Sequence, residues 1–76
     1  MKIIVTEKIA DKGIELLQNV PGVEVFVYRE IKREELLDVI DQYDAMIVRS
    51  VTKVDEELYQ RAKKLKVVGR AGNGVD

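Results

Sequence analysis

Short β-branched runs alternate along this chain with longer amphipathic stretches that carry most of its charge. The apolar runs lie at residues 3–5, 23–28 and 45–48, and a fourth strand is predicted over residues 66–69 around Val67 and Val68. The runs at 3–5 and 45–48 contain no polar residue, which is typical of strands buried on both faces of a parallel sheet. Glu24 interrupts the run at 23–28, so we expect that strand to lie at an edge with one face partly in water.

The stretches between these runs have the periodicity of helices that bury one face. A first helix is predicted within about residues 8–19, where apolar side chains recur at spacings of one, three and four: Ile9, Ala10, Ile14, Leu17 and Val20. A second helix is predicted over residues 32–41. Asp55 is a suitable N-cap for a third helix, whose apolar positions are Leu58, Ala62 and Leu65.

The resulting order is β-α-β-α-β-α-β, and each crossover is long enough to hold a helix. Such crossovers are right-handed in nearly all proteins and build a parallel sheet with helices on its faces, so the predicted class is α/β with three layers. Because the run at 3–5 is fully apolar, we place it centrally and predict the strand order 2-1-3-4, as in flavodoxin-like folds. The first helix then covers one face of the sheet, and the second and third helices cover the other.

Composition removes several classes of chemistry. The 76 residues include no histidine and no cysteine, which excludes a disulfide framework, a thiol nucleophile, a Ser-His-Asp triad and a zinc finger; a metal would need oxygen ligands alone. Lys plus Arg number 13 against 14 Asp plus Glu, and this near balance argues against a nucleic-acid partner. No apolar run is long enough to span a membrane and no secretory signal follows Met1, so the sequence predicts a cytoplasmic protein.

Ligands of an open parallel sheet bind at the carboxyl ends of the strands, near the point where strand order reverses. Three segments of this chain occupy those ends. Thr6, Glu7 and Lys8 follow the first strand, and we expect them to form a helix cap with solvated charges.

Arg49 and Ser50 follow the third strand. A guanidinium fork and hydroxyl groups at this position can bind an anion such as a carboxylate or a phosphate. The alternative is local structure, in which Arg49 pairs with an acid and Ser50 or Thr52 caps the loop.

Three glycines, Gly69, Gly72 and Gly74, stand within six residues at the end of the fourth strand. Glycine lets successive backbone N–H groups turn toward one ligand, so this segment can form an anion-binding nest. Two alternatives remain open. Gly72 and Gly74 fit the first two positions of the G-x-G-x-x-G dinucleotide fingerprint, and the segment can also be a plain flexible tail.

The sequence AMIVRSVTKV at 45–54, followed by LKVVGRAGNGVD at 65–76, resembles the amino-terminal region of the D-isomer-specific 2-hydroxyacid dehydrogenase family. The resemblance covers the whole chain, with strands and helices in register from Ile3 onward. In that family an inserted NAD-binding Rossmann domain carries the G-x-G-x-x-G loop and the catalytic Arg, Glu and His. None of those has a matching position in this sequence.

What the resemblance implies for this chain is a substrate-binding role, with no catalytic residue, no cofactor of its own and NAD in the parent enzyme. The pocket for an anionic substrate would include Arg49, Ser50, Arg70, Gly72, Asn73 and Gly74. Backbone amides around Asn73 and Gly74 would hold the substrate carboxylate, and Gly72 would shape the loop.

The resemblance also implies that residues 1–76 form a truncated flavodoxin-like domain, without the fifth strand and its helices and without the nucleotide-binding domain. The sheet face over the third and fourth strands would then be bare on the side of the first helix. It would carry alternate residues of 45–48 and one of Val67 or Val68. We expect a homodimer through this face or the free edge of the fourth strand, with exchange of elements between chains as one form of it.

Three functions of the chain itself follow from these observations. The favoured one is a structural or folding unit without turnover. The alternatives are a weak carboxylate- or phosphate-binding module and an independent dinucleotide-binding unit.

Overall fold

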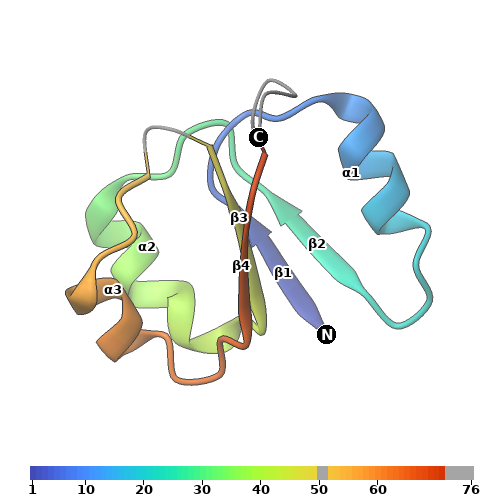
Figure 1. Ribbon diagram of the computed structural model, residues 1–76. Coiled ribbons are helices and arrows are strands. Elements are labelled where there is room, and N and C mark those ends of the chain that lie inside the picture. Colours follow the sequence, from blue (N-terminus) through green and yellow to red (C-terminus); the bar gives the residue numbers. More distant parts are fainter. Residues whose placement is uncertain (50–51, 72–76) are drawn as a thin grey trace.

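Four parallel strands form one sheet, in a computed structural model that describes residues 1–49 and 52–71 (Figure 1). The strands are β1 (Lys2–Val5), β2 (Glu24–Val27), β3 (Ala45–Val48) and β4 (Val67–Arg70). Their spatial order is β2-β1-β3-β4, so the predicted α/β class and strand order 2-1-3-4 are confirmed. β2 lies at an edge, as its single glutamate indicated.

The helices lie between the strands and are shorter than the sequence pattern predicted. They are α1 (Asp11–Gln18), α2 (Arg33–Val39), which continues into the 3₁₀ turn η1 (Ile40–Gln42), and α3 (Glu56–Arg61). Figure 1 shows α1 on one side of the sheet and α2 and α3 on the other, as right-handed crossovers require.

Helix ends explain the shortening. Ala10 has extended dihedral angles (φ −61°, ψ 137°), so α1 begins at Asp11 and Ile9 lies before it. The expected role of Thr6 as a helix cap is therefore wrong, because Thr6 lies well before the first turn of the helix. Asp55 does cap α3, since its carboxylate accepts a hydrogen bond from the Leu58 N–H at 3.1 Å. Leu65 lies beyond the end of that helix.

The hydrophobic core lies between the sheet and the side that carries α2, η1 and α3. Ile4 and Met46 point to this side from the two central strands and are fully buried. They pack with buried side chains of the helical layer: Leu36, Ile40, Tyr43, Leu58 and Ala62. Burial of a large aliphatic side chain stabilises a fold by about 1.5–3 kcal/mol, so this layer supplies most of the stability of so small a domain.

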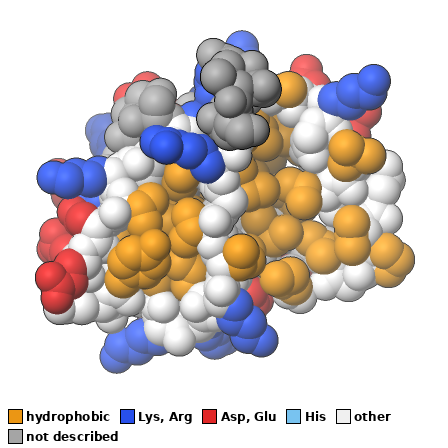
Figure 2. All heavy atoms as spheres, in the orientation of Figure 1, with side chains coloured by type: hydrophobic (Ala, Val, Ile, Leu, Met, Phe, Trp, Pro, Cys, Tyr) orange, Lys and Arg blue, Asp and Glu red, His pale blue; other side chains and the backbone are white. Residues whose placement is uncertain are grey.

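The opposite face of the sheet, on the side of α1, is only partly covered. No residue of α1 is buried, and Leu16 on that helix is 69% exposed. Over β3 and β4, Ile47 is half-buried and Val67 is 52% exposed, whereas Ala45 is buried. Figure 2 shows hydrophobic side chains at the surface on both flanks of β4. The expected apolar exposure over β3 and β4 thus centres on Ile47 and Val67.

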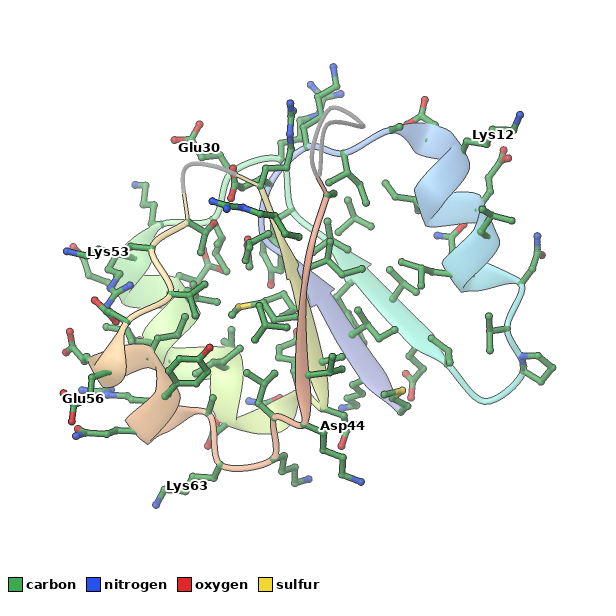
Figure 3. The ribbon with its side chains drawn as sticks, viewed as in Figure 1. Lys12, Glu30, Asp44, Lys53, Glu56 and Lys63 are labelled. Carbon is green, nitrogen blue, oxygen red and sulfur yellow. The ribbon has the colours of Figure 1, made fainter. Side chains whose placement is uncertain are left out.

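Asp44 joins three strands at their amino ends, opposite the end marked by Glu30 in Figure 3. Its carboxylate accepts from the Lys2 backbone N–H at 2.8 Å, and its carbonyl accepts from the Lys66 N–H at 2.7 Å. The hydrogen bond from Lys2 lowers the pKa of the Asp44 carboxyl. These contacts set the register of β1, β3 and β4, and thereby bring their carboxyl ends to one level.

Candidate functional site

The carboxyl ends of β1, β3 and β4 meet at one edge of the sheet. β1 leads into Thr6 and Glu7, β3 leads into Arg49, and β4 ends at Arg70. The Ala71 N–H donates to the Val48 carbonyl at 2.8 Å, which continues the pairing of β3 and β4 past their last paired residues. The segments that follow these strands therefore lie side by side.

Arg49 and Arg70 are brought together at this edge, as the sequence predicted. The Arg70 Nε donates to the Arg49 carbonyl at 3.2 Å, and the Arg49 Nη1 donates to the Lys8 carbonyl at 3.1 Å. Each guanidinium is a planar group with five N–H donors, so these contacts place two multivalent cationic groups at one edge of the sheet. The other predicted site residues lie outside the described part of the chain: Ser50, Gly72, Asn73 and Gly74.

Both arginines line an open cavity of about 500 Å³ between α3 and the ends of β3 and β4. Its apolar wall comes from Val48, Val54 and Val68. Lys53 is a third cation of the lining, and no acidic residue is among the residues that line this cavity in the described part of the chain. An excess of cationic donors over an apolar wall suits a small organic anion.

The charge of Glu7 was expected to be solvated, and this prediction is wrong. Thr6 is fully buried and Glu7 is 5% exposed. The Glu7 Oε2 accepts from the backbone N–H groups of Arg49 and Thr52, each at 2.8 Å. The signal that could have found Glu7 was its position: an acid two residues past the end of a buried central strand lies at the same edge as the loop after the neighbouring strand.

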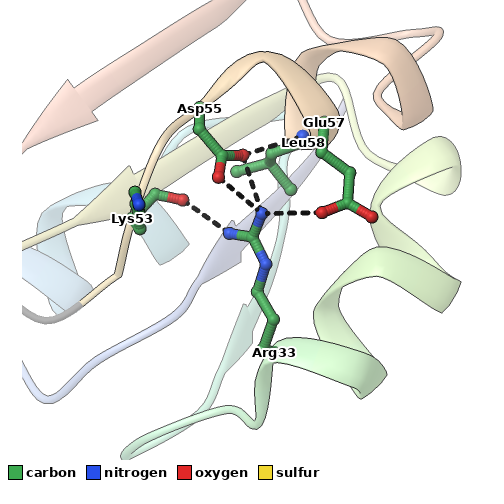
Figure 4. A network of polar contacts seen from close by, with 5 residues as sticks. All are labelled: Arg33, Lys53, Asp55, Glu57 and Leu58. Atoms are coloured by element: carbon green, nitrogen blue, oxygen red, sulfur yellow. Dashed lines mark hydrogen bonds and ion pairs between the residues drawn. The ribbon is translucent and has the colours of Figure 1, made fainter.

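Arg33 at the start of α2 holds the far end of the β3–α3 connection (Figure 4). Its Nη2 donates to both carboxylate oxygens of Asp55 at 2.7 and 2.8 Å, and its Nη1 donates to the Lys53 carbonyl at 2.8 Å. The same Nη2 lies 3.4 Å from Glu57 Oε1. The bond from Arg33 lowers the pKa of the Asp55 carboxyl, and the pairing raises the pKa of Arg33.

Dinucleotide cofactors need a glycine-rich turn between a strand and a helix, where the backbone meets the pyrophosphate. The β–α connections that follow β1, β2 and β3 span residues 6–10, 28–32 and 49–55 and contain no glycine. These connections lack the turn that NAD binding needs.

The described residues, 1–49 and 52–71, contain no group of three or more His, Cys, Asp or Glu side chains that could hold a metal ion. The helices in the same residues are too short and too polar to span a membrane.

Comparison with known proteins identifies relatives over the whole chain. The family described as "D-isomer specific 2-hydroxyacid dehydrogenase, catalytic domain" matches residues 3–76. D-3-phosphoglycerate dehydrogenase of Archaeoglobus fulgidus is 47% identical over 76 residues, and the enzyme of Synechocystis is 40% identical over 75. These matches cover 100% and 99% of this chain but only 14% and 13% of the relatives, so the chain spans a small part of their length.

A solved structure has the same fold. The NAD⁺-bound 3-phosphoglycerate dehydrogenase of Entamoeba histolytica superposes with a TM-score of 0.78 at 33% identity, covering 100% of this chain and 27% of that one. The PH0520 protein of Pyrococcus horikoshii gives a TM-score of 0.75, also at 33% identity, over 91% of this chain and 20% of the other. Sequence and fold therefore agree with the resemblance inferred from residues 45–54 and 65–76, and the chain belongs to the D-isomer specific 2-hydroxyacid dehydrogenase family.

Proposed function

We propose that this chain is the substrate-binding part of a dehydrogenase of the D-3-phosphoglycerate type. The parent reaction would be the NAD-dependent oxidation of 3-phosphoglycerate to 3-phosphohydroxypyruvate, a step of serine biosynthesis in the cytoplasm. The names of the relatives support this substrate. The NAD⁺ bound to the Entamoeba enzyme supports the cofactor.

The observation that carries the proposal is that Arg49 and Arg70 line the same cavity. Both arginines come from the carboxyl ends of adjacent strands, and the cavity lining adds Lys53 but no acid among the described residues. Guanidinium groups bind carboxylates and phosphates through parallel N–H donors. A phosphorylated hydroxyacid carries both groups and matches this edge in charge.

The chemistry of hydride transfer belongs to the remainder of the parent protein in this proposal. The β–α connections of this chain do not fit NAD, and the sequence has no histidine to act as an acid or base at neutral pH. The 76 residues therefore bind and orient the acid without turnover of their own.

Calorimetric titration of the chain with 3-phosphoglycerate and, separately, with NAD tests the proposal. We expect weak binding of 3-phosphoglycerate, weakened further in Arg49→Gln and Arg70→Gln, and no heat with NAD. Lys63→Gln is the matched control, because Lys63 is an exposed cation away from the cavity lining. Binding of neither ligand would favour the folding-unit function, and binding of NAD would favour an independent dinucleotide-binding unit.

We also propose that the isolated chain forms a homodimer through the apolar face over β3 and β4. Val67 is 52% exposed there, Ile47 is half-buried beside it, and β4 pairs with β3 alone among the described strands. Apolar surface next to an unpaired strand edge favours association with a second copy. Sedimentation of a folded monomer at micromolar concentration would contradict this proposal.

A further inference from the structure

Glu7 is an acid buried beside a site that is otherwise cationic. Only 5% of its surface is exposed, and it follows β1 at the edge where Arg49 and Arg70 meet. Burial of a carboxylate is costly unless hydrogen bonds satisfy its oxygens. The partners of Glu7 therefore indicate what it does.

Two backbone N–H groups after β3 donate to one oxygen of this carboxylate. The Arg49 N–H and the Thr52 N–H each lie 2.8 Å from Glu7 Oε2. Hydrogen bonds to an ionised acceptor are about twice as strong as neutral ones. Because the two donors stand three positions apart in sequence, a single oxygen fixes the direction in which the chain leaves β3.

Two further contacts join the segment after β1 to the segment after β3. The Thr6 and Thr52 hydroxyls lie 2.8 Å apart, and the Arg49 Nη1 donates to the Lys8 carbonyl at 3.1 Å. Arg49 is thus fixed twice, at its backbone by Glu7 and at its guanidinium by Lys8. Arg33 holds the other end of the same connection through the Lys53 carbonyl.

We propose that Glu7 is a positioning residue of the anion site: its carboxylate sets the backbone from which Arg49 reaches a carboxylate or phosphate of the substrate. This inference rests on the proposed substrate-binding function. A positioning role and a purely electrostatic role of Glu7 predict opposite effects on anion binding. A negative charge beside an anion site repels the anion, so a role through charge alone would oppose binding, whereas a role through position supports it.

Two conservative variants separate charge from reach. Glu7→Asp keeps the charge but shortens the side chain by one methylene, so its oxygen no longer reaches both N–H groups. Glu7→Gln loses the charge but keeps an oxygen at the same distance, which can accept from both. Glu30→Gln is the matched control, because Glu30 is exposed and lies on the segment that pairs with Glu7.

We expect Glu7→Asp to weaken 3-phosphoglycerate binding about tenfold, since it disrupts hydrogen bonds to a charged group. Glu7→Gln should bind more tightly than Glu7→Asp, and Glu30→Gln should not weaken binding. A role through charge alone predicts a different pattern, with Glu7→Asp unchanged and Glu7→Gln tighter than the unsubstituted chain. That result would overturn the proposal.

Amide hydrogen exchange by NMR separates failure of this inference from failure of the proposed function. We expect faster exchange at the Arg49 and Thr52 amides in Glu7→Asp, with a circular dichroism spectrum that matches the unsubstituted chain. Unchanged exchange at both amides would overturn the positioning role by itself. Absence of 3-phosphoglycerate binding by the unsubstituted chain would instead contradict the proposed function.

Discussion

The two faces of the sheet differ in how they are covered. On the side of α2, η1 and α3, Ile4, Met46 and Leu58 are fully buried in one cluster. On the side of α1, the helix buries none of its residues, and Val67 remains 52% exposed. The same four strands thus support one fully packed layer and one that is left open at Ile47 and Val67.

This difference follows from where each helix lies. α2 and α3 lie together over the central strands, and their apolar positions meet one cluster. α1 lies over the edge strand β2, so its apolar side chains do not cover Ile47 on β3 or Val67 on β4, which lie on the same face towards the other edge of the sheet. Stability is therefore concentrated on one face, and surface for association remains on the other.

The largest expected effect is on the packed face. Leu58→Ala should lower the free energy of unfolding by about 2–5 kcal/mol, because it leaves a cavity in a fully buried cluster. The control is Leu16→Ala on α1, which removes the same atoms from a side chain that is 69% exposed and should cost less than about 0.5 kcal/mol. Urea unfolding measures the free energy of unfolding of both variants. Equal losses in the two variants would contradict the difference between the two faces.

A charge on the open face should act on association rather than on folding. Val67→Lys is expected to raise the dimer dissociation constant at least about tenfold, since it places an ammonium group in an apolar contact. Its free energy of unfolding as a monomer should change little. Val20→Lys, at a position 46% exposed after the end of α1, is the control. Sedimentation velocity checks both, and an unchanged constant in Val67→Lys would place the contact elsewhere.

Acid should weaken the packed face through Asp55. The bond from Arg33 lowers the pKa of this carboxyl in the folded chain, so its contribution to stability is present above its unfolded pKa of about 4 and is lost as pH falls through the folded pKa. Asp55→Asn keeps a good N-cap but loses the ion pair. It should flatten the dependence of unfolding free energy on pH below about 4.

Arg33→Gln is the companion variant for that measurement. It removes the cation while leaving Asp55 in place, so it should flatten the same pH range. An unchanged acid profile in both variants, measured by thermal unfolding between pH 2 and 7, would show that the pair in Figure 4 does not link α2 to α3 in solution.

The fold was predictable because the strands are unambiguous. The run at 45–48 is fully apolar and became β3 with the expected bounds, and the fully apolar run at 3–5 lies within central β1. Helix bounds were less accurate, since the apolar positions of Ile9 and Leu65 continue a helical spacing that the backbone does not follow. Periodicity records which side chains are apolar and not where backbone hydrogen bonding ends.

The site was only partly predictable for a related reason. Arg49 and Arg70 were found because each follows a predicted strand, and the carboxyl ends of parallel strands meet at one edge. Glu7 follows a strand too, but its burial depends on N–H groups of Arg49 and Thr52, which lie 42 and 45 positions away in sequence. A glutamate satisfied by distant backbone amides has the same local pattern as a solvated one.

The most direct test of substrate binding at this edge is a map of the amides that respond to 3-phosphoglycerate in the NMR spectrum of the isolated chain. We predict shifts at Arg49, Thr52 and Arg70, at the carboxyl ends of β3 and β4, with no response from α1 or β2. Saturating shifts confined to α1 and β2, or no shift at any amide at millimolar ligand, would contradict the claim that this chain binds the anionic substrate at that edge.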